Sequence, residues 1–417
     1  MELASFPLRG VPAPRVQLFV SDLSATGVVR NAVAIANRAA ANGYDVRILT
    51  CSADGVLSDL VDPRVPVVEL LKGTRETLSR RTQLRQTFLA YRRHCRDWRP
   101  DILFSAGNHG HLLSTFAWLG LPGSKLLRIS NDLDHGSPNP SARIWRSLKF
   151  RLMMSLADRI VLVSRTSGNH GPLSRLIGNG KAVAIPNGVD VQAVRTASLE
   201  PCPHPWAASR DVPIVLAIGR HVKQKNFATL LKAFAKARRQ RELRLIFLGE
   251  GQAGESVRLH NLAISLGVAA DVDFVAATSN PFPYMAAAHV LALPSLWEGS
   301  SNVLLEALAC ETPVIASRTA GDAEQQLSYG RFGLLVDPLD SDGLAAAILR
   351  QTGQDAVDPS SRALAFDRAV ALEDYMRVFR QCIGRATRSG QALRNPDPAA
   401  PPPGIPASAR SASLPTR

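Results

Sequence analysis

Short apolar runs that alternate with amphipathic helical segments constrain the fold of this chain more than any other feature. The run Arg15–Val20 is predicted to be a strand, a helix follows from about Arg30 to Asn42, and Val46–Thr50 is predicted to be the next strand. Gly43 is a typical residue just past a helix end. A strand, a helix and a strand in this order form a βαβ unit, whose strands lie parallel in one sheet.

The same alternation continues along the chain. Further strands are predicted at residues 102–105, 126–130, 159–164 and 213–218. At 417 residues the chain is long for one domain and natural for two. We therefore expect an α/β protein in which each domain is a mostly parallel sheet covered by helices on both faces.

A basic loop follows the apolar run Pro213–Ile218. It begins with Gly219 and Arg220, contains Lys225, and leads into a helix with apolar residues at helical spacing from Phe227. Parallel sheets bind ligands at the carboxyl ends of their strands, where Arg220 and Lys225 stand. Arginine can grip phosphate with two hydrogen bonds and lysine acts as a point charge, so the loop is a candidate anion site. The alternative is a solvated basic loop, which is common in so basic a chain.

The segment Ser295–Cys310 carries two glutamates, Glu298 and Glu306. The four residues Gly299–Asn302 between them indicate a loop that becomes a helix, because serine and asparagine are favoured at helix starts. The unpaired N–H groups of such a start favour an anion such as a diphosphate. Carboxylates repel phosphate, so both glutamates must face hydroxyl groups, and a sugar nucleotide offers hydroxyls on both sides of a diphosphate. Taken singly, either glutamate is better explained as a solvated surface acid.

Together these segments resemble the retaining nucleotide-sugar glycosyltransferases of group 1, or family 4. These enzymes have GT-B architecture, in which two Rossmann-like domains face each other across a cleft. The similarity covers roughly residues 15–384 and is strongest from about 185 to 340. Further segments similar to the family are Ile185–Asp190, Leu245–Gly251, Ala309–Ser317, Gly321–Glu324, Gly333–Val336 and a closing helix within Phe366–Phe379.

The resemblance implies a division of the chain. Residues 1–186 would form an acceptor domain, 187–365 a nucleotide-sugar donor domain, and 366–384 a closing helix that returns toward the first domain. Residues 385–417 are basic and rich in Pro, Ser and Ala. They are predicted to form a disordered tail because they cannot bury enough apolar surface.

The resemblance also implies roles for individual residues. Arg220 and Lys225 would hold the donor diphosphate and stabilise it as it leaves, together with the helix amides near Ser301. Glu306 would bind the ribose and Glu298 would contact the donor sugar. The predicted donor site consists of Gly27, Gly219, Arg220, Lys225, Glu298, Gly299, Ser300, Ser301, Asn302, Val303 and Glu306. We expect a nucleotide-sugar co-substrate, with a UDP-sugar favoured, and neither a cofactor nor an obligatory metal.

The chain departs from the family pattern in several places. Many members have a histidine after the strand predicted at 126–130, whereas this chain has Asn131–His135 there. Asp132, His135 or the upstream His109 are candidates to replace it, although a lone histidine is more often structural than catalytic. Glu311 stands where the family usually has a glycine, and a glutamate there disfavours a left-handed turn.

The chain is strongly basic, with 49 Lys and Arg against 35 Asp and Glu and a net charge of +14. Two segments, Arg75–Arg99 and Arg143–Arg165, concentrate arginine. Such faces suit docking to anionic lipid, and a merely solvated face is equally consistent. Neither segment has the pattern of a nucleic-acid reader. Apolar residues at helical spacing in the first segment favour core packing over membrane insertion: Leu84, Phe88, Tyr91, Cys95 and Trp98.

Compartment signals are few. The five cysteines show no CxxC spacing, which fits structural thiols in a reducing compartment. The N-terminus shows no apolar signal core, and no apolar run reaches the ~20 residues that span a bilayer. We expect a cytoplasmic protein, with the inner face of the plasma membrane as one option.

The leading hypothesis is a retaining, hexosyltransferase-type glycosyltransferase. It would move a sugar from a nucleotide diphosphate donor to a hydroxyl of a glycan or lipid-linked acceptor, in bacterial cell-surface polysaccharide or lipopolysaccharide synthesis. A sugar-nucleotide epimerase or phosphorylase of the same architecture is a second reading. A third is a non-catalytic subunit that binds a nucleotide sugar or membrane and scaffolds a glycan assembly complex. An NAD-dependent enzyme is the weakest reading, because no Gly-x-Gly-x-x-Gly follows the first strand.

Overall fold

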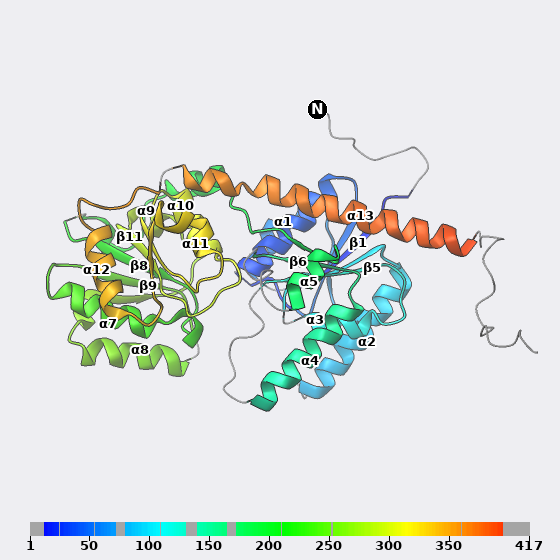
Figure 1. Ribbon diagram of the computed structural model, residues 1–417, viewed down its shortest axis with the longest axis horizontal. Helices are drawn as coiled ribbons and strands as arrows, with labels where there is room; N and C mark the ends of the chain where they lie inside the picture. Colours follow the sequence, from blue (N-terminus) through cyan, green and yellow to red (C-terminus); the bar gives the residue numbers. More distant parts are fainter. Residues whose placement is uncertain are drawn as a thin grey trace, which may run out of the picture.

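The structure is a computed structural model. It describes residues 12–394 except for residues 25, 54, 72–79, 109, 131–139, 165–171, 210, 252 and 360. Two α/β domains lie next to each other, and the long helix α13 (Arg368–Arg394) runs from the second domain across the first (Figure 1). The predicted fold class of two Rossmann-like domains is confirmed.

The first domain is built on a parallel sheet with the strand order β3-β2-β1-β4-β5-β6-β7. Its strands are β1 (Arg15–Phe19), β2 (Asp45–Thr50), β3 (Val67–Glu69), β4 (Ile102–Ser105), β5 (Ser124–Ile129), β6 (Arg159–Leu162) and β7 (Ala182–Ala184). Its helices are α1 (Gly27–Ala41), α2 (Arg80–Trp98), α3 (His111–Ala117), α4 (Pro140–Leu156) and α5 (Pro172–Gly178). The strand order reverses between β1 and β4, and parallel sheets usually bind ligands outside the carboxyl ends of the strands at such a point.

The second domain repeats this plan with the order β10-β9-β8-β11-β12-β13, again all parallel. Its strands are β8 (Ile214–Ile218), β9 (Arg244–Leu248), β10 (Val272–Val275), β11 (Val290–Leu293), β12 (Val314–Ser317) and β13 (Leu334–Val336). Its helices are α6 (Val191–Ser198), α7 (Phe227–Arg238), α8 (Ala253–Ser265), α9 (Phe282–Ala287), α10 (Asn302–Ala309), α11 (Ala323–Gln326) and α12 (Ser341–Gln351). Here the order reverses between β8 and β11.

Three inner strands of the two sheets are buried along their whole length. Every residue of β4, β11 and β12 is buried, as expected where helices cover both faces of a parallel sheet. The helix α13 completes the core of the first domain: the ring of Phe379 packs edge-on against that of Phe104, 5.9 Å between centroids. The C-terminal helix is therefore part of the first domain's core, although it follows the second domain in sequence.

The chain passes between the domains twice, and the two passages lie together. The Val189 N–H donates to the Phe366 carbonyl at 2.8 Å, and the Arg368 N–H donates to the Val189 carbonyl at 3.1 Å. A Cβ on Gly188 would lie 2.5 Å from the Arg368 Cα, so only glycine allows this approach. This paired crossing fixes where the two domains join.

Several local predictions differ from the structure. The helix α1 begins at Gly27 rather than near Arg30, because the Thr26 hydroxyl accepts the Val29 N–H at 3.3 Å and caps the helix earlier. The helix α13 continues to Arg394, past the predicted end at residue 384. The chain has no proline in this stretch before Pro396. The rest of the predicted tail, residues 395–417, lies outside the described residues.

Two further predictions concern single side chains. In α2, Tyr91, Cys95 and Trp98 are buried and Phe88 is partly buried, which confirms core packing for these four residues of the stripe. Glu311 adopts a left-handed conformation with φ 58°, the geometry that favours glycine. Its carboxylate forms an ion pair with Arg195 of α6, so this departure from the family pattern is accommodated without a change of turn.

Candidate active site

The candidate site lies where the second sheet reverses its strand order, at the carboxyl ends of β8 and β11. Gly219 follows β8 and Gly249 follows β9, both with φ 145°. A Cβ on Gly249 would lie 2.3 Å from the Gly219 carbonyl oxygen, so a side chain there cannot be accommodated. Because neither glycine has a side chain, a ligand can approach the backbone closely at this edge of the sheet.

Lys225 and Glu298 form an ion pair on this edge. The Lys225 Nζ lies 2.7 Å from Glu298 Oε1, and little of either side chain is exposed, 15% and 12%. Glu298 also accepts hydrogen bonds from the Ser295 hydroxyl at 2.9 Å and from Gln224 Nε2 at 3.4 Å. The structure thus brings together the two residues predicted to touch the diphosphate and the donor sugar, and holds both within the second domain.

Arg220 stands at the start of the same loop and is exposed. In the described part of the chain, its guanidinium forms no hydrogen bond or ion pair. The next residue, His221, is buried and its Nδ1 lies 2.8 Å from the Ser256 hydroxyl, which anchors the loop. Arg220 is therefore a free cation on an anchored backbone, available to an anionic ligand.

The start of α10 is open. Ser301 occupies the N-cap position and is buried, but its side chain makes no capping hydrogen bond. The first N–H groups of this helix thus have no side-chain acceptor from the cap residue, which leaves them available to an anion. The neighbouring residues are packed: a Cβ on Gly321 would lie 2.4 Å from the Gly299 carbonyl oxygen, and Val303 packs against the core of the second domain.

We call residues 187–189, where the chain first passes between the domains, the crossing segment. This segment and the first domain contact the start of α10 through the side chain of Asn302. Its Oδ1 accepts hydrogen bonds from Asn187 Nδ2 at 2.8 Å and from Asn31 Nδ2 at 3.5 Å. Asn187 Nδ2 also lies within hydrogen-bonding distance of the Ser300 carbonyl, at 3.3 Å. A Cβ on Gly27 would lie 2.2 Å from Asn302 Nδ2, so this glycine of the first domain lies against the start of α10.

Glu306 lies one turn into α10 and is buried, with 8% of its surface exposed. Burial raises the pKa of its carboxyl, and the charges of Arg30 on α1 and Arg368 on α13 oppose that rise. Among the described residues, its carboxylate accepts no hydrogen bond. Glu306 is thus a desolvated acid that lacks a direct partner and lies between arginines of two other structural units.

Two family models match this chain. One, described as "Glycosyl transferases group 1", covers residues 212–352, and the other, "Glycosyltransferase Family 4", covers residues 25–193. The chain belongs to the group 1, family 4 glycosyltransferases. The candidate site lies in the part matched by the group 1 model, and the helix α1 that faces it lies in the part matched by the family 4 model.

Relatives of this glycosyltransferase include enzymes of glycan assembly. It is 25% identical over 351 residues to N-acetylgalactosamine-N,N'-diacetylbacillosaminyl-diphospho-undecaprenol 4-alpha-N-acetylgalactosaminyltransferase of Campylobacter jejuni, covering 81% of this chain and 91% of that protein. It is 38% identical over 138 residues to the lipopolysaccharide core biosynthesis glycosyltransferase LpsE of Rhizobium meliloti, 33% of this chain and 39% of that protein. The Anabaena protein Alr3699/HepE, solved in complex with UDP-glucose, shares the fold with a TM-score of 0.70 at 18% identity, over 88% of this chain and 99% of that one.

Sequence reasoning did not select a buried arginine of this glycosyltransferase. Arg128, on β5, is 1% exposed. Its guanidinium donates to the Tyr375 hydroxyl at 2.9 Å, the Ala106 carbonyl at 3.2 Å and Asn187 Oδ1 at 2.7 Å. It therefore ties β5, α13 and the crossing segment together, and orients the amide of Asn187 toward α10. An arginine inside an apolar strand is itself a signal of a partnered, buried charge.

The candidates for the missing family histidine cannot be placed. Asp132, His135 and His109 lie outside the described residues. The nearby His111 is buried, with Nδ1 2.8 Å from the Ser105 hydroxyl and Nε2 3.0 Å from the Arg128 carbonyl oxygen. Since a carbonyl oxygen can only accept, Nε2 donates to it, and the ring links β4 to β5.

The described carboxylates are not gathered into a metal centre. No group of three or more His, Cys, Asp or Glu side chains that could hold a metal occurs within the described residues. The Asp-x-Asp triple at 271–273 is engaged elsewhere: Asp271 pairs with Arg238 and Arg244, and Asp273 lies 3.0 Å from His204. In the triple at 340–342, Asp340 caps α12 and Asp342 pairs with Lys236. A third triple, 132–134, lies outside the described residues.

Proposed function

We propose that this glycosyltransferase moves a sugar from a nucleotide diphosphate donor, with a UDP-sugar favoured, to a hydroxyl of a glycan or lipid-linked acceptor, with retention at the anomeric carbon. The observation that carries the proposal is the open start of α10 beside the free cation Arg220 and the Lys225–Glu298 pair. At one edge of the second sheet, the cations and helix amides offer contacts for a diphosphate, and the carboxylate offers contacts for hydroxyl groups.

The leaving diphosphate would gain negative charge as the sugar–phosphate bond breaks. Arg220, Lys225 and the first amides of α10 would stabilise that charge, which lowers the barrier of the transfer step. The departing phosphate oxygen would then accept the proton of the incoming hydroxyl on the same face of the sugar. This route requires no side-chain nucleophile and gives retention.

The two glutamates would recognise the hydroxyl groups on either side of the diphosphate. Glu298, held by Lys225 and Ser295, would accept from the donor sugar. Glu306 is buried, and no described residue donates a hydrogen bond to its carboxylate. It would accept hydrogen bonds from the ribose hydroxyls. A nucleotide in the cleft would give the Glu306 carboxylate the hydrogen bonds that it lacks, which is a reason for it to bind.

Neither a cofactor nor a metal has a part in this proposal. The two basic side chains and the helix amides would supply the positive charge that a divalent cation provides in other transferases. The test is turnover after treatment with a chelator: undiminished activity is expected, and a loss restored by one divalent cation would contradict this part.

The acceptor would enter from the first domain. The diphospho-undecaprenol named in the Campylobacter relative supports a lipid-linked acceptor, as used in bacterial surface polysaccharides. We place the enzyme in the cytoplasm, in peripheral contact with anionic lipid at the inner face of the plasma membrane.

The decisive experiment is a thermal-shift panel of UDP, GDP, ADP and their common sugars against the wild type and Glu306→Ala. A nucleotide at a hundred times its Kd should stabilise the wild type by about 2.7 kcal/mol and the variant much less. Product analysis with and without an acceptor then separates transfer from epimerisation, which needs no acceptor. If no nucleotide shifts the folded wild type, the donor site is wrong and a non-catalytic scaffold becomes the better reading.

A further inference from the structure

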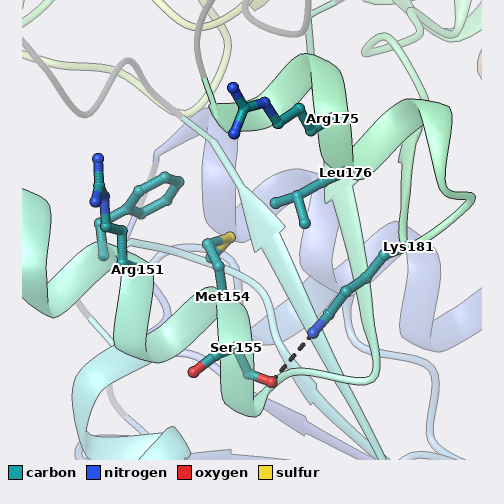
Figure 2. Close-up of a pocket in the computed structure, with 7 residues that line it drawn as sticks. Arg151, Met154, Ser155, Arg175, Leu176 and Lys181 are labelled. Atoms are coloured by element: carbon teal, nitrogen blue, oxygen red, sulfur yellow. Dashed lines mark hydrogen bonds between the residues drawn. The ribbon is translucent and has the colours of Figure 1, made fainter.

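A cavity of about 570 Å³ opens in the first domain between the C-terminal half of α4 and α5. Figure 2 shows Met154 and Leu176 facing the cavity, with Arg151, Arg175 and Lys181 around them. We call this cavity the α4–α5 slot. Its complete lining is Phe150, Arg151, Met154, Ser155, Arg175, Leu176 and Lys181. An apolar interior beneath three cations suits a molecule that joins a hydrocarbon to an anion.

The slot lies at the opposite end of the first sheet from the sugar-transfer cleft. Lys181 directly precedes β7 and Ser155 lies shortly before β6, so the slot is at the amino ends of these strands. The donor site stands at carboxyl ends of strands in the other domain. The residues of the slot have no part in the proposed transfer, and they need a different explanation.

The charge of the slot is not balanced from within. In the described part of the chain no acid lines it, and the guanidinium groups of Arg151 and Arg175 form no hydrogen bond or ion pair. Lys181 Nζ donates to the Ser155 carbonyl at 3.1 Å, which holds it over the end of α4 (Figure 2). Asp158, the nearest acid in sequence, is engaged by Lys125 instead: the two side chains lie 3.8 Å apart, and Asp158 accepts the Lys125 N–H at 2.8 Å. An anion bound here would meet three cations.

An apolar stripe on α4 continues from the slot to the surface. Ile144, Trp145, Leu148 and Leu152 are 62%, 65%, 52% and 44% exposed. Positions 144, 148 and 152 fall on one face of the helix, because residues four apart are neighbours. Leu152 adjoins Arg151 of the slot. We call these four residues the α4 stripe. Apolar surface of this kind on a soluble protein marks an interaction site, and cations beside it favour anionic lipid.

The neighbouring helix α3 enlarges the apolar surface. Leu112 and Phe116 are exposed on this helix, Leu119 is exposed just after its end, and α3 packs against α4. In Figure 1, α4 projects below the body of the first domain. Among the described residues, no helix is long and apolar enough to cross a bilayer. The geometry of the stripe is that of a helix lying in the plane of a membrane surface.

We propose that the α4–α5 slot binds an anionic phospholipid, with its phosphate against Arg151, Arg175 and Lys181 and the upper part of its acyl chain against Met154 and Leu176. The α4 stripe inserts beside it among the lipid chains. This proposal deepens the membrane contact proposed above and rests on it, but it is independent of the sugar transfer. A specific lipid site would orient the first domain on the membrane, whereas a basic face alone would not.

The test is flotation of the full chain with two kinds of vesicle, one of phosphatidylcholine alone and one in which about one third of the lipid is phosphatidylglycerol. We expect binding that requires the anionic lipid. Arg175→Glu should weaken it about tenfold or more, and Leu176→Asp, which places an acid in the slot, by a similar factor. The matched control is Arg239→Glu, an equal charge change at an exposed residue after α7 in the second domain, which should bind like the wild type.

A second readout separates the slot from general attraction to the surface. Monomeric short-chain phosphatidylglycerol should raise the Tm of the wild type but not that of Leu176→Asp. Phosphatidylcholine of the same chain length and inorganic phosphate should leave the Tm of the wild type unchanged. If the slot variants float like the wild type while Trp145→Ser with Leu148→Ser does not, the membrane contact stands and the slot is overturned. If the wild type does not float, or floats equally with phosphatidylcholine, both are overturned. The nucleotide shift of the same variants reports on the donor site, and its failure alone would leave the slot intact.

Discussion

The surroundings of Glu298 and Glu306 differ in kind, although the two glutamates flank one helix start. Glu298 is held inside the second domain, by an ion pair with Lys225 and a hydrogen bond from Ser295. Glu306 is buried without a hydrogen bond in the described residues, and the charges nearest to it belong to α1 of the first domain and to α13. One half of the site is therefore complete within its own domain, and the other is completed by its neighbours.

The same division holds for the residues between them. The backbone of Gly299 packs closely against Gly321 of the same domain, while Asn302 accepts hydrogen bonds from Asn187 of the crossing segment and Asn31 of the first domain. The surroundings of Glu306 and Asn302 thus depend on contact between the domains, because Arg30 and Asn31 belong to α1. Opening of the domains would remove these two residues and leave the ion pair of Glu298 with Lys225 unchanged.

The largest effect is expected for Lys225→Ala, which breaks the half of the site that is complete. Loss of a charge at the leaving diphosphate should lower kcat/KM by roughly 100- to 1,000-fold, about 3–4 kcal/mol. The folded state should also lose stability, because the partly buried Glu298 carboxylate keeps its desolvation without its cation. Steady-state kinetics and urea unfolding measure the two effects separately.

The control for this prediction is the double variant Lys225→Met with Glu298→Gln, which removes both charges and keeps the shapes. Stability should return toward that of the wild type while activity stays low. A double variant as unstable as Lys225→Ala would contradict the view that the pair, rather than the packing of Lys225, holds this edge of the site together.

Glu306→Gln should behave in the opposite way, with a loss of affinity and a gain of stability. A charged acceptor for the ribose would be lost, which should weaken nucleotide binding by about 2 kcal/mol, roughly 30-fold in Kd. The folded protein should become more stable at neutral pH by on the order of 1 kcal/mol, because a buried charge without a hydrogen bond is removed. Calorimetric titration with nucleotide and thermal unfolding measure the pair of effects.

The effect of Glu306→Gln on stability should also depend on pH. Burial raises the pKa of Glu306 above its ordinary 4.5 in the folded state. Its neutral form therefore favours folding below pH 4.5, and that contribution is lost as the pH rises through the folded pKa. The difference in Tm between Glu306→Gln and the wild type should be small at pH 4 and grow toward pH 7. A constant difference would mean that Glu306 is ionised at no cost in the folded protein.

The half of the site that is complete within one domain is also the half that sequence predicted best. Local patterns indicate local structure: the basic loop after β8 and the helix start at Ser301 both lie where the apolar periodicity and capping residues predicted. The partners of Asn302 and Glu306 could not be derived in this way, because Asn31, Arg30, Asn187 and Arg368 come from three distant segments. Whether these side chains meet depends on how two domains pack, which no local pattern encodes. The start of α1 was misplaced for a smaller reason, since Thr26 was not recognised as its N-cap.

Asn187→Ala tests the half of the site that depends on the domain contact. It removes an acceptor from the buried Arg128 guanidinium and a donor from Asn302 and Ser300. Unsatisfied buried groups should cost about 1–3 kcal/mol of stability. Nucleotide affinity should fall together with stability, and addition of nucleotide should not restore the stability of the wild type. Asn187→Asp is the informative control, because it keeps the acceptor for Arg128 and loses the donor to α10. If it matches Asn187→Ala in stability, Arg128 does not depend on this contact.

The smallest effect is expected for Glu311→Gly, at the end of α10 that faces away from the site. Glycine relieves the left-handed conformation of Glu311, which costs a non-glycine residue about 1 kcal/mol. It also removes the exposed ion pair with Arg195, worth about 0–1 kcal/mol. The net result should be a gain of about 0.5 kcal/mol in unfolding free energy, with nucleotide affinity unchanged. Glu311→Gln keeps the strained conformation and loses the charge, so it should be slightly less stable than the wild type. A loss of stability in Glu311→Gly would mean that the pair with Arg195 outweighs the strain. Glu311 would then resemble Glu298, whose place is set by a cation of its own domain.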